Sequence, residues 1–305
     1  MKPLVAVVGP TASGKSDLGL EIAMARRGEI INLDASQIYR GMDIGTAKTP
    51  ACERGGVPHH MIDLLEVRQS ASVAEFQQLA RAAIDEVRER DHLPVCVGGS
   101  GLYVRAVLED LEFPRTDPAL RARLEAELER VGAAALHARL ASVDARAAAA
   151  IVPGNTRRVV RALEVLELTG RPFAAVLPQH ARREPDVRIG LTVPRELLLV
   201  RIRERVQRMW AAGLVDEVRW LEAQGLRQGR TAPKALGYQQ VLAFLAGECS
   251  ETAALEATVA GTVKFARRQM QWFRRDQAIQ WLEFDDPRLL QRALALIDAA
   301  PAQPH

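Results

Sequence analysis

A glycine-rich loop follows the first apolar segment, and it restricts the possible folds of this 305-residue chain more than any other feature. The loop fits the pattern G-x-x-x-x-G-K-[ST] without a mismatch. Its two glycines let the backbone turn N–H groups toward an anion, its lysine adds a positive charge, and its last hydroxyl can bind Mg²⁺. An apolar strand over 4–8 and a helix over 17–27 give the context that the motif requires. We therefore expect this loop to bind a diphosphate or triphosphate through Gly9, Pro10, Thr11, Ala12, Ser13, Gly14, Lys15 and Ser16.

The composition is typical of a soluble globular protein. Hydrophobic residues make up 48% and charged residues 26% of the chain, and no apolar run approaches the roughly 18 residues of a membrane span. The three cysteines, Cys52, Cys96 and Cys249, are too widely spaced for a C-x-x-C metal site and favour a reducing compartment. We therefore expect a cytoplasmic protein without a membrane anchor. Most of the 41 basic residues are arginines, but the net charge is only +3, so only the clustering of arginines is informative.

Apolar segments alternate with helical stretches in the first part of the chain. The apolar segments lie at 4–8, 29–34 and 93–98, and each ends in polar or glycine residues. This alternation predicts an α/β fold of the P-loop NTPase type, in which helices flank a parallel sheet. Ligands of such sheets bind outside the carboxyl ends of the strands. We therefore expect Asp34, Gly98 and Ser100 to gather around the phosphate-binding loop.

The strand pattern stops after residue 114. Up to residue 185 the sequence is typical of arginine- and alanine-rich helices. Glycine and proline residues break these helices at Gly132, Pro153, Gly154, Gly170 and Pro172. A strand pattern returns over 187–193, and helical patterns follow over 195–224, with an interruption at Gly213, and over 252–275. The sequence thus predicts a catalytic core of residues 1–114 and 186–305, with an inserted all-helical subdomain over 115–185.

Asp34 ends the second apolar segment. A carboxylate at this place can bind Mg²⁺, hold a sugar hydroxyl or take a proton from a nucleophile. The alternative is a structural role, because Asp side chains often hydrogen-bond the backbone of a turn. The polar residues Ser36 and Gln37 follow it, and they can hydrogen-bond the edge of an adenine.

A second glycine-rich turn, over 98–103, follows the third apolar segment. Its N–H groups and the Ser100 hydroxyl can approach the same phosphates closely. Alternatively, the glycines give a strand-to-helix turn its backbone freedom. The sequence leaves both interpretations open.

Two predicted helices carry clustered basic residues, which make credible contacts with a nucleic-acid backbone. The clusters are Arg157, Arg158 and Arg161 on one helix, and Lys264, Arg267, Arg268 and Arg275 on the other. Trp272 and Phe273 lie beside the second cluster, where they can pack or stack on bases. Either cluster alone is also compatible with an ordinary solvated face. The paired histidines His59 and His60 lack further ligands at metal-binding spacing and are expected to be structural.

Taken together, these motifs resemble those of the bacterial tRNA dimethylallyltransferases, also called tRNA isopentenyltransferases. The resemblance extends over nearly the whole chain. It covers residues 9–16, 34–48, 57–63, 98–103, 157–165, 205–218, 235–238 and 264–274.

The resemblance implies that the loop holds the diphosphate of dimethylallyl diphosphate with Mg²⁺, although loops of this type are usually described as ATP-binding. It implies transfer of the dimethylallyl group to the N6 amine of the adenosine just 3′ of the anticodon in tRNA. By the family pattern, Asp34 is the general base, Lys15 and Ser100 are the other catalytic residues, and Ser16 is the metal ligand. Ser100 stands where the family usually has threonine. It keeps the hydroxyl but lacks a methyl group, which predicts somewhat looser positioning.

The resemblance also implies a set of tRNA contacts. The matched positions are Asp34, Ala35, Ser36, Gln37, Ser100, Arg121, Arg157, Arg158, Val159, Val160 and Arg161. The insertion over 115–185 is therefore expected to hold the anticodon stem-loop of tRNA. We expect the protein to act as a monomer.

Three other functions are compatible with parts of the sequence. A P-loop kinase for a small molecule would use Asp34 as the base for a substrate hydroxyl, but it leaves the basic helices without a role. An RNA-binding GTPase-like switch lacks a motif for guanine and a second Mg²⁺ carboxylate in this chain. A prenyltransferase for free adenine nucleotides would not need the arginine-rich insertion. The tRNA-modifying function accounts for all of these features.

Overall fold

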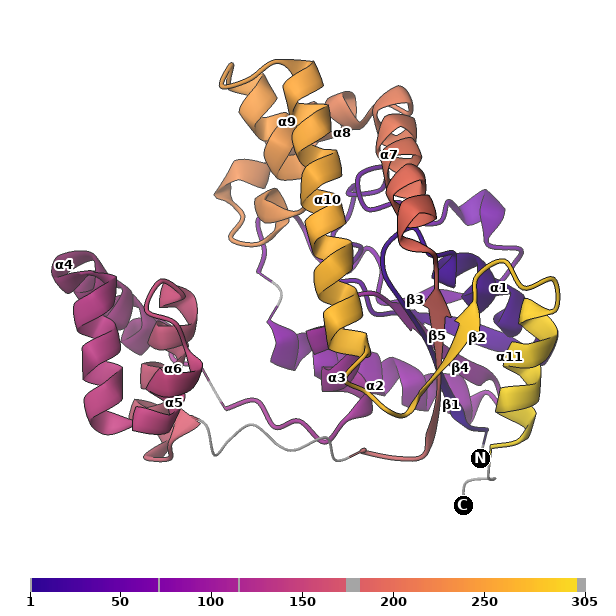
Figure 1. Ribbon diagram of the computed structural model, residues 1–305, viewed down its shortest axis with the longest axis horizontal. Coiled ribbons are helices and arrows are strands. Elements are labelled where there is room, and N and C mark those ends of the chain that lie inside the picture. Colours follow the sequence, from indigo (N-terminus) through magenta and orange to yellow (C-terminus); the bar gives the residue numbers. More distant parts are fainter. Residues whose placement is uncertain (1, 71, 115, 174–181, 301–305) are drawn as a thin grey trace. The chain divides into compact units, whose positions relative to one another are not determined.

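The structure is a computed structural model, and it describes residues 2–70, 72–114, 116–173 and 182–300. Its described strands form one sheet of six, in the order β3-β2-β4-β1-β5-β6, and every neighbouring pair is parallel (Figure 1). The strands are β1 Leu4–Val8, β2 Gly28–Asn32, β3 His59–His60, β4 Leu93–Gly98, β5 Asp186–Thr192 and β6 Ile279–Glu283. The expected parallel α/β sheet of the P-loop NTPase type is confirmed.

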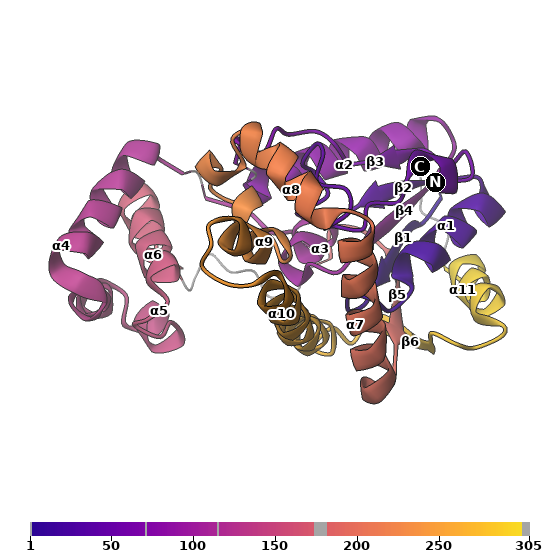
Figure 2. The same cartoon turned by 90° about the horizontal axis from the view of Figure 1, so that it is seen from above.

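Helices cover both faces of this sheet. The helices of the sheet-containing part are α1 Lys15–Arg26, α2 Val73–Glu89, α3 Gly101–Leu108, α7 Arg195–Ala211, α8 Leu214–Ala223, α9 Tyr238–Leu245, α10 Glu251–Phe273 and α11 Leu289–Asp298. Figures 1 and 2 show α1 and α11 on one face, and α2 and α3 on the other. A hydrophobic core lies on each face of the sheet, and alternate residues of β1 point into one core or the other. Val5 and Val7 pack toward α1 and α11, whereas Leu4 and Ala6 pack toward α2 and α3. Continuous apolar strands are needed because both faces are buried.

The helices α7 to α10 pack on one another beyond the carboxyl ends of the strands (Figure 1). The expected break at Gly213 is confirmed, since this residue lies between α7 and α8 with φ 97°. A left-handed backbone of this kind suits glycine and ends the first helix. None of the helices in the described ranges combines the length and the apolar composition needed to cross a membrane.

Residues 109–183 form a separate compact unit, and residues 1–108 with 184–305 form the other. The described helices of the 109–183 unit are α4 Pro118–Val143, α5 Ala145–Ala150 and α6 Thr156–Thr169. Gly132 interrupts α4 with φ 81°, as its glycine predicts. Leu124, Leu140 and Leu163 belong to a buried cluster that is confined to this unit. The unit therefore has a hydrophobic core of its own.

Glu29 on β2 makes the fold sensitive to acid. Its buried carboxylate accepts hydrogen bonds from Arg90 at 2.7 and 3.0 Å and is hydrogen-bonded to His60 and His92, each at 2.6 Å. Hydrogen bonding to Arg90, opposed by burial and assisted by the histidines, lowers the pKa of Glu29 to about 2. The folded pKa lies below the unfolded one, so this stabilisation is complete above pH 4.5 and is lost as pH falls toward 2.

We expect Glu29→Gln to lower the free energy of unfolding by about 3 kcal/mol near pH 7, in proportion to the pKa shift. Urea unfolding at a series of pH values checks this, because the variant should also lose much of the decline in stability between pH 4.5 and 2. The matched control is Glu53→Gln, at an exposed carboxylate, which should change stability by less than about 0.5 kcal/mol. Equal stability of the Glu29 variant and the wild type would contradict the assignment.

Candidate active site

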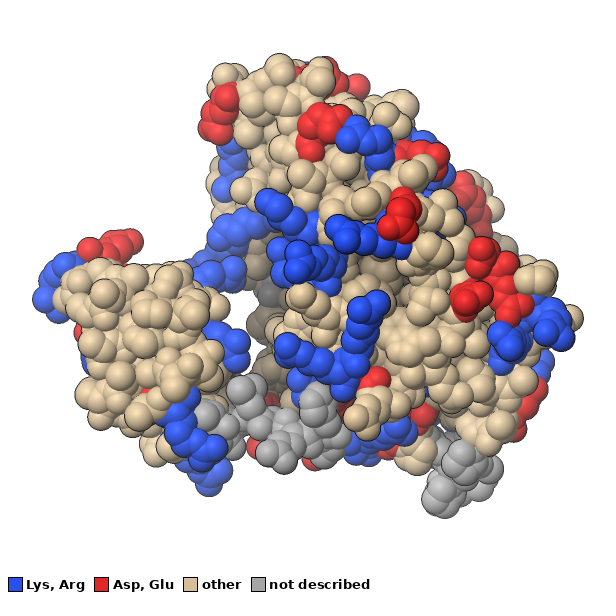
Figure 3. Space-filling view, viewed as in Figure 1, with Lys and Arg blue, Asp and Glu red and all other residues tan. Residues whose placement is uncertain are grey.

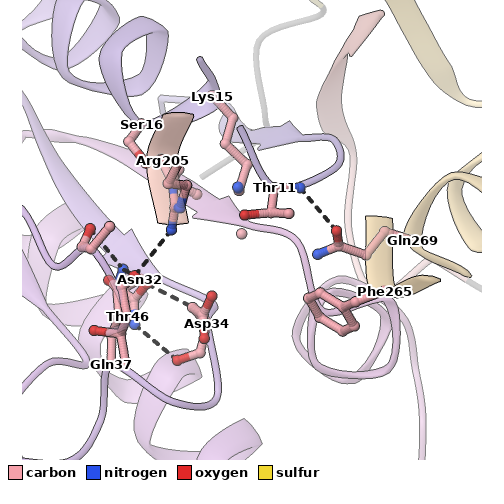
Figure 4. Close-up of a pocket in the computed structure, with 13 residues that line it drawn as sticks. Thr11, Lys15, Ser16, Asn32, Asp34, Gln37, Thr46, Arg205, Phe265 and Gln269 are labelled. Carbon is pink, nitrogen blue, oxygen red and sulfur yellow. Dashed lines mark hydrogen bonds between the residues drawn. The ribbon is translucent and has the colours of Figure 1, made fainter. Parts of the chain in front are cut away.

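The loops after β1, β2 and β4 meet at the carboxyl edge of the sheet, where two cavities share part of their lining. The smaller cavity, of about 50 Å³, is lined by Thr11, Lys15, Ser16, Asn32, Asp34, Gln37, Thr46, Ala47, Val97, Gly98, Arg205, Phe265 and Gln269 (Figure 4). The larger, of about 460 Å³, shares Thr11, Asp34, Thr46, Arg205 and Phe265 with it, and Ala35, Ser36 and Ser100 also line it. The structure thus brings Asp34, Gly98 and Ser100 to the phosphate-binding loop, as the strand pattern predicts.

The phosphate-binding loop is shaped to receive an anion. Gly9 and Gly14 adopt positive φ angles of 151° and 92°, which glycine tolerates, and Ala12 adopts φ 64°. Gly14 is the N-cap of α1, and because glycine has no side chain it makes no capping hydrogen bond to the N–H groups that follow. The N–H groups of the first turn of α1 therefore stay available to a bound anion, where the helix dipole also favours negative charge.

Lys15 and Arg205 add two positive charges to the smaller cavity. Burial and then repulsion from Arg205 lower the pKa of Lys15 to about 8, although Asp34 and Asp17 attract the proton. Burial is also the main cause that lowers the pKa of Arg205. Within the described residues neither cation forms an ion pair, and Arg205 donates one hydrogen bond, to Thr46 O at 3.3 Å. Two cations without ion-pair partners, beside the single carboxylate of Asp34 in this cavity, favour an anionic ligand.

One carboxylate oxygen of Asp34 stabilises a turn, and the other is left without a hydrogen bond in the described part of the chain. Its Oδ1 accepts a hydrogen bond from the Ser36 N–H at 2.9 Å, so the turn role is present. Asn32 holds the same turn, because its amide nitrogen donates to Asp34 O at 3.1 Å and its amide oxygen accepts from the Asp34 N–H at 3.2 Å. In the described part of the chain nothing hydrogen-bonds the second carboxylate oxygen, and the side chain lines both cavities. Asp34 is therefore oriented by the turn and remains able to accept a proton.

Glu217 on α8 supports the loop that borders the smaller cavity. Its carboxylate accepts hydrogen bonds from the N–H groups of Asp43, Ile44 and Gly45, at 3.1, 2.6 and 3.2 Å, and from the Tyr238 hydroxyl at 2.6 Å. Within the same loop, the carbonyl of Thr46 accepts from Gln37 at 3.1 Å and from Arg205 at 3.3 Å. The amide nitrogen of Gln37 is thus occupied inside the protein. The expected hydrogen bond of Gln37 to a base would therefore have to be accepted by its amide oxygen.

The second glycine-rich turn packs closely against its neighbours, and its expected approach to the phosphates stays a prediction. None of its glycines adopts a positive φ, so backbone freedom does not explain them. A Cβ at Gly98 would lie 2.6 Å from Leu33, and a Cβ at Gly101 would lie 3.0 Å from Trp272. These glycines let the turn pack closely against its neighbours. Ser100 lies between them and lines the larger cavity.

The predicted tRNA-contact residues of the 109–183 unit have distinct environments. Arg157 and Arg158 are exposed on α6. Arg121 and Arg161 both pair with the buried Glu164, whose pKa they lower against the effect of burial. Val159 and Val160 are 1% and 4% exposed and belong to the core of the unit. The two valine side chains therefore support α6 from within, and the exposed arginines offer the accessible charge.

The expected basic face of α10 is exposed. Lys264, Arg267 and Arg268 on α10 and Arg275, which follows the end of α10, are all solvent-accessible. Figure 3 shows Lys and Arg side chains gathered over the region of α10. Trp272 is 43% exposed, whereas Phe273 is buried, so only the first can stack on a base. Arg268 lines the larger cavity and lies over the Phe265 ring at 5.9 Å.

Sequence reasoning did not assign three residues of this site, namely Arg205, Glu217 and Gln269. Arg205 and Glu217 lie in segments that resemble the family, yet α7 also carries Arg201, Arg203 and Arg208. Periodicity alone does not tell which of these arginines faces a cavity. Arg205 is identified as a site residue only from the structure, in which it lines the cavity without an ion-pair partner among the described residues.

The parallel sheet, the glycine-rich loop after its first strand and the helices on both faces define a protein with a P-loop NTPase-like fold. A family model described as IPP transferase matches residues 37–276. The chain therefore belongs to the IPP transferase family.

Similar proteins agree with this assignment. The chain is 59% identical to the tRNA dimethylallyltransferase of Thermobifida fusca, over 97% of this chain and 95% of that protein. It is also 59% identical to the tRNA dimethylallyltransferase of Streptomyces coelicolor, over 97% and 96% of the two chains. Among solved structures, the tRNA isopentenylpyrophosphate transferase of Bacillus halodurans is 40% identical, with a TM-score of 0.71 and coverage of 98% and 97%.

Proposed function

We propose that this protein transfers the dimethylallyl group of dimethylallyl diphosphate to the N6 amine of the adenosine 3′-adjacent to the anticodon in tRNA, with release of diphosphate. One observation carries the proposal: the anion-binding loop and the Asp34 carboxylate line the same pair of cavities. Prenyl transfer to an amine needs an anion site for the leaving diphosphate and a base for the amine proton. The names of the relatives at 59% identity supply the two substrates.

The diphosphate of the donor would bind in the smaller cavity. Lys15 and Arg205 supply positive charge there, and the N–H groups of the first turn of α1 supply hydrogen bonds. Negative charge grows on the diphosphate as the carbon–oxygen bond breaks, and these preorganised groups stabilise it. Val206, Met209 and Leu236 of the larger cavity would cover the apolar prenyl chain.

The oxygen donors on this side of the site fit a Mg²⁺ ion. The Ser16 hydroxyl is exposed at the smaller cavity. Mg²⁺ commonly takes one or two protein oxygens together with phosphate oxygens and water. Among the residues that the structure describes, no group of three or more His, Cys, Asp or Glu side chains forms a metal cage. We therefore propose Ser16 as the protein ligand of an ion that, when bound, neutralises part of the diphosphate charge.

The acceptor adenine would enter the larger cavity and meet Asp34. Its amine is a weak nucleophile because the lone pair is delocalised into the ring. As the bond from N6 to the allylic carbon forms, the electron pair of the breaking carbon–oxygen bond leaves with diphosphate, and Asp34 takes the amine proton. Ser100 would orient the acceptor through its hydroxyl. Because the base is stacked in the anticodon loop, it must turn out of the stack to reach this cavity.

Arg157, Arg158 and the basic face of α10 would hold the backbone of the tRNA. We also propose that the protein acts as a monomer. A protein that modifies tRNA in this way would act in the cytoplasm.

A transfer assay tests the function. The protein is incubated with Mg²⁺, radiolabelled dimethylallyl diphosphate and unmodified tRNA that has adenosine at the 3′-adjacent position, with AMP and ATP as competing acceptors. We expect label in the tRNA. Label in AMP or ATP would instead assign the protein to the free-nucleotide prenyltransferases. Absence of label together with consumption of ATP would indicate a kinase.

The role of the 109–183 unit has its own test. We expect the double variant Arg157→Ala/Arg158→Ala to raise the KM for tRNA by about 10-fold with little change in kcat, because phosphate contacts contribute to affinity. The dependence of KM on salt should also become shallower. Steady-state kinetics at several salt concentrations measure both effects. The control is Arg130→Ala, at an exposed arginine of α4 that should leave KM unchanged. A KM for the double variant equal to that of the wild type would contradict the proposed contact.

A further inference from the structure

The side chain of Gln269 connects two loops of the site that lie far apart in the sequence. Gln269 is on α10 and is 4% exposed. Its Oε1 accepts a hydrogen bond from the Thr11 N–H at 2.9 Å, and its Nε2 donates to Gly99 O at 2.8 Å. Figure 4 shows the amide beside Thr11, with the first of these bonds drawn. One amide therefore joins the phosphate-binding loop to the turn that carries Ser100.

Both ends of this amide are specified by their partners. A glutamine amide has one acceptor oxygen and a donor nitrogen, so only one orientation satisfies the Thr11 N–H and the Gly99 carbonyl together. Buried backbone groups that lose their partners cost free energy. The fit is also steric, because a Cβ on Gly99 would lie 2.3 Å from Nε2. A side chain at position 99 would therefore displace the Gln269 amide.

We propose that Gln269 is a positioning residue for the transfer reaction, which fixes the phosphate-binding loop at the right distance from the Ser100 turn. This role rests on the proposed function. Gln269 would act through Thr11 on the donor side and through Gly99 on the acceptor side. A displacement of about 1 Å between reacting groups can lower a rate by roughly 100-fold. The loss should therefore appear in kcat more than in KM.

The first test is Gln269→Met, which keeps the volume of the side chain and removes both hydrogen bonds. We expect kcat to fall by about 10- to 100-fold, with the KM for each substrate within about threefold of the wild type. The kinetics are measured well below the melting temperature of the variant, so that unfolding does not contribute. The matched control is Gln291→Met, at an exposed glutamine of α11, which should leave kcat unchanged.

The second test is Gln269→Glu, whose effect should depend on pH. A protonated carboxyl group has one acceptor oxygen and one O–H donor, so it can make both bonds of the amide. The ionised form cannot donate to Gly99 O. Burial disfavours the ionised form, whereas Lys15 and Arg205, which line the same cavity as Gln269, favour it. Because only the protonated form makes both bonds, we expect the ratio of the variant kcat to the wild-type kcat to rise as pH falls. The ratio is followed down to the lowest pH at which both proteins stay folded. A purely structural role would leave this ratio flat wherever both proteins are folded.

The outcomes separate the two proposals. A wild-type protein that labels tRNA, with a Gln269→Met variant of equal kcat, would overturn the role of Gln269 alone. A flat pH ratio for Gln269→Glu, at a kcat equal to that of the wild type, would do the same. A wild-type protein that labels no tRNA would overturn the proposed function, and the role of Gln269 with it. A lowered kcat with unchanged KM, together with the pH-dependent recovery, would establish the positioning role.

Discussion

Replacement of Asp34 by asparagine is expected to lower kcat by about 10²- to 10⁴-fold, the usual contribution of a general base. Asparagine has nearly the same shape, and its amide oxygen can still accept the hydrogen bond from the Ser36 N–H that shapes the turn. It cannot take the amine proton. The KM for tRNA should therefore change by less than about threefold, because the variant removes an interaction of the transition state. Single-turnover transfer to tRNA, together with a tRNA-binding measurement, separates the two quantities.

The control for this variant is Asp285→Asn, at an exposed carboxylate outside the site. It should leave both kcat and tRNA affinity unchanged. If Asp34→Asn weakened tRNA affinity as much as it slowed transfer, Asp34 would be a binding residue. If it left kcat intact, another group would have to accept the proton.

Lys15→Met should have the other large effect. Loss of the positive charge at the smaller cavity is expected to lower kcat by about 10²- to 10³-fold and to raise the KM for dimethylallyl diphosphate, because the charge on the leaving diphosphate loses a preorganised partner. The KM for tRNA should change little. Transfer kinetics with each substrate varied in turn measure these constants. Equal losses for both substrates would show that the substitution disturbs the whole site.

The pH dependence of kcat/KM in the wild-type enzyme should reflect the loss of the positive charge of Lys15. The pKa of this lysine is lowered to about 8, and only the protonated form attracts the diphosphate. The ratio kcat/KM for the donor reports groups of the free enzyme, so it should be maximal below this pKa and fall as pH rises through it. Arg205→Gln removes a repulsion that lowers the pKa of Lys15, and it should move the alkaline limb to higher pH. The control Arg288→Gln, at an exposed residue, should leave the limb in place.

The sheet and its anion-binding loop follow from local patterns in the sequence. The strands β1 and β4 are short runs of mainly apolar residues, which is what burial on both faces requires, and β2 contributes the buried pair Ile30 and Ile31. The loop over 9–16 is contiguous, so its spacing alone identifies it. Asp34 and Ser100 could be placed near this loop because parallel strands deliver their carboxyl ends to one edge. These inferences need no knowledge of how the helices pack.

The remaining site residues depend on packing that periodicity does not determine. Gln269 and Glu217 reach the loops from α10 and α8, and the loop residues that they contact are more than 150 positions away in the chain. The arginines of the 109–183 unit show the same limit. Arg157 and Arg161 are one turn apart on α6, yet only Arg161 meets the buried Glu164. The sequence therefore predicts that a helix carries a positive charge at a given position, but it does not predict which residue that charge will contact.

The tight packing of the turn at 98–101 has an evolutionary consequence. Every substitution of Gly98 adds at least a Cβ, which would lie 2.6 Å from the Cβ and 2.8 Å from the backbone oxygen of Leu33. Selection for a folded protein then acts against such alleles, even without selection for catalysis. A descendant that has lost its enzymatic activity would keep Gly98 for as long as it keeps this fold. Retention of the turn in a diverged sequence thus indicates common ancestry and a preserved fold. Enzymatic activity has to be inferred from the presence of Asp34 and Lys15.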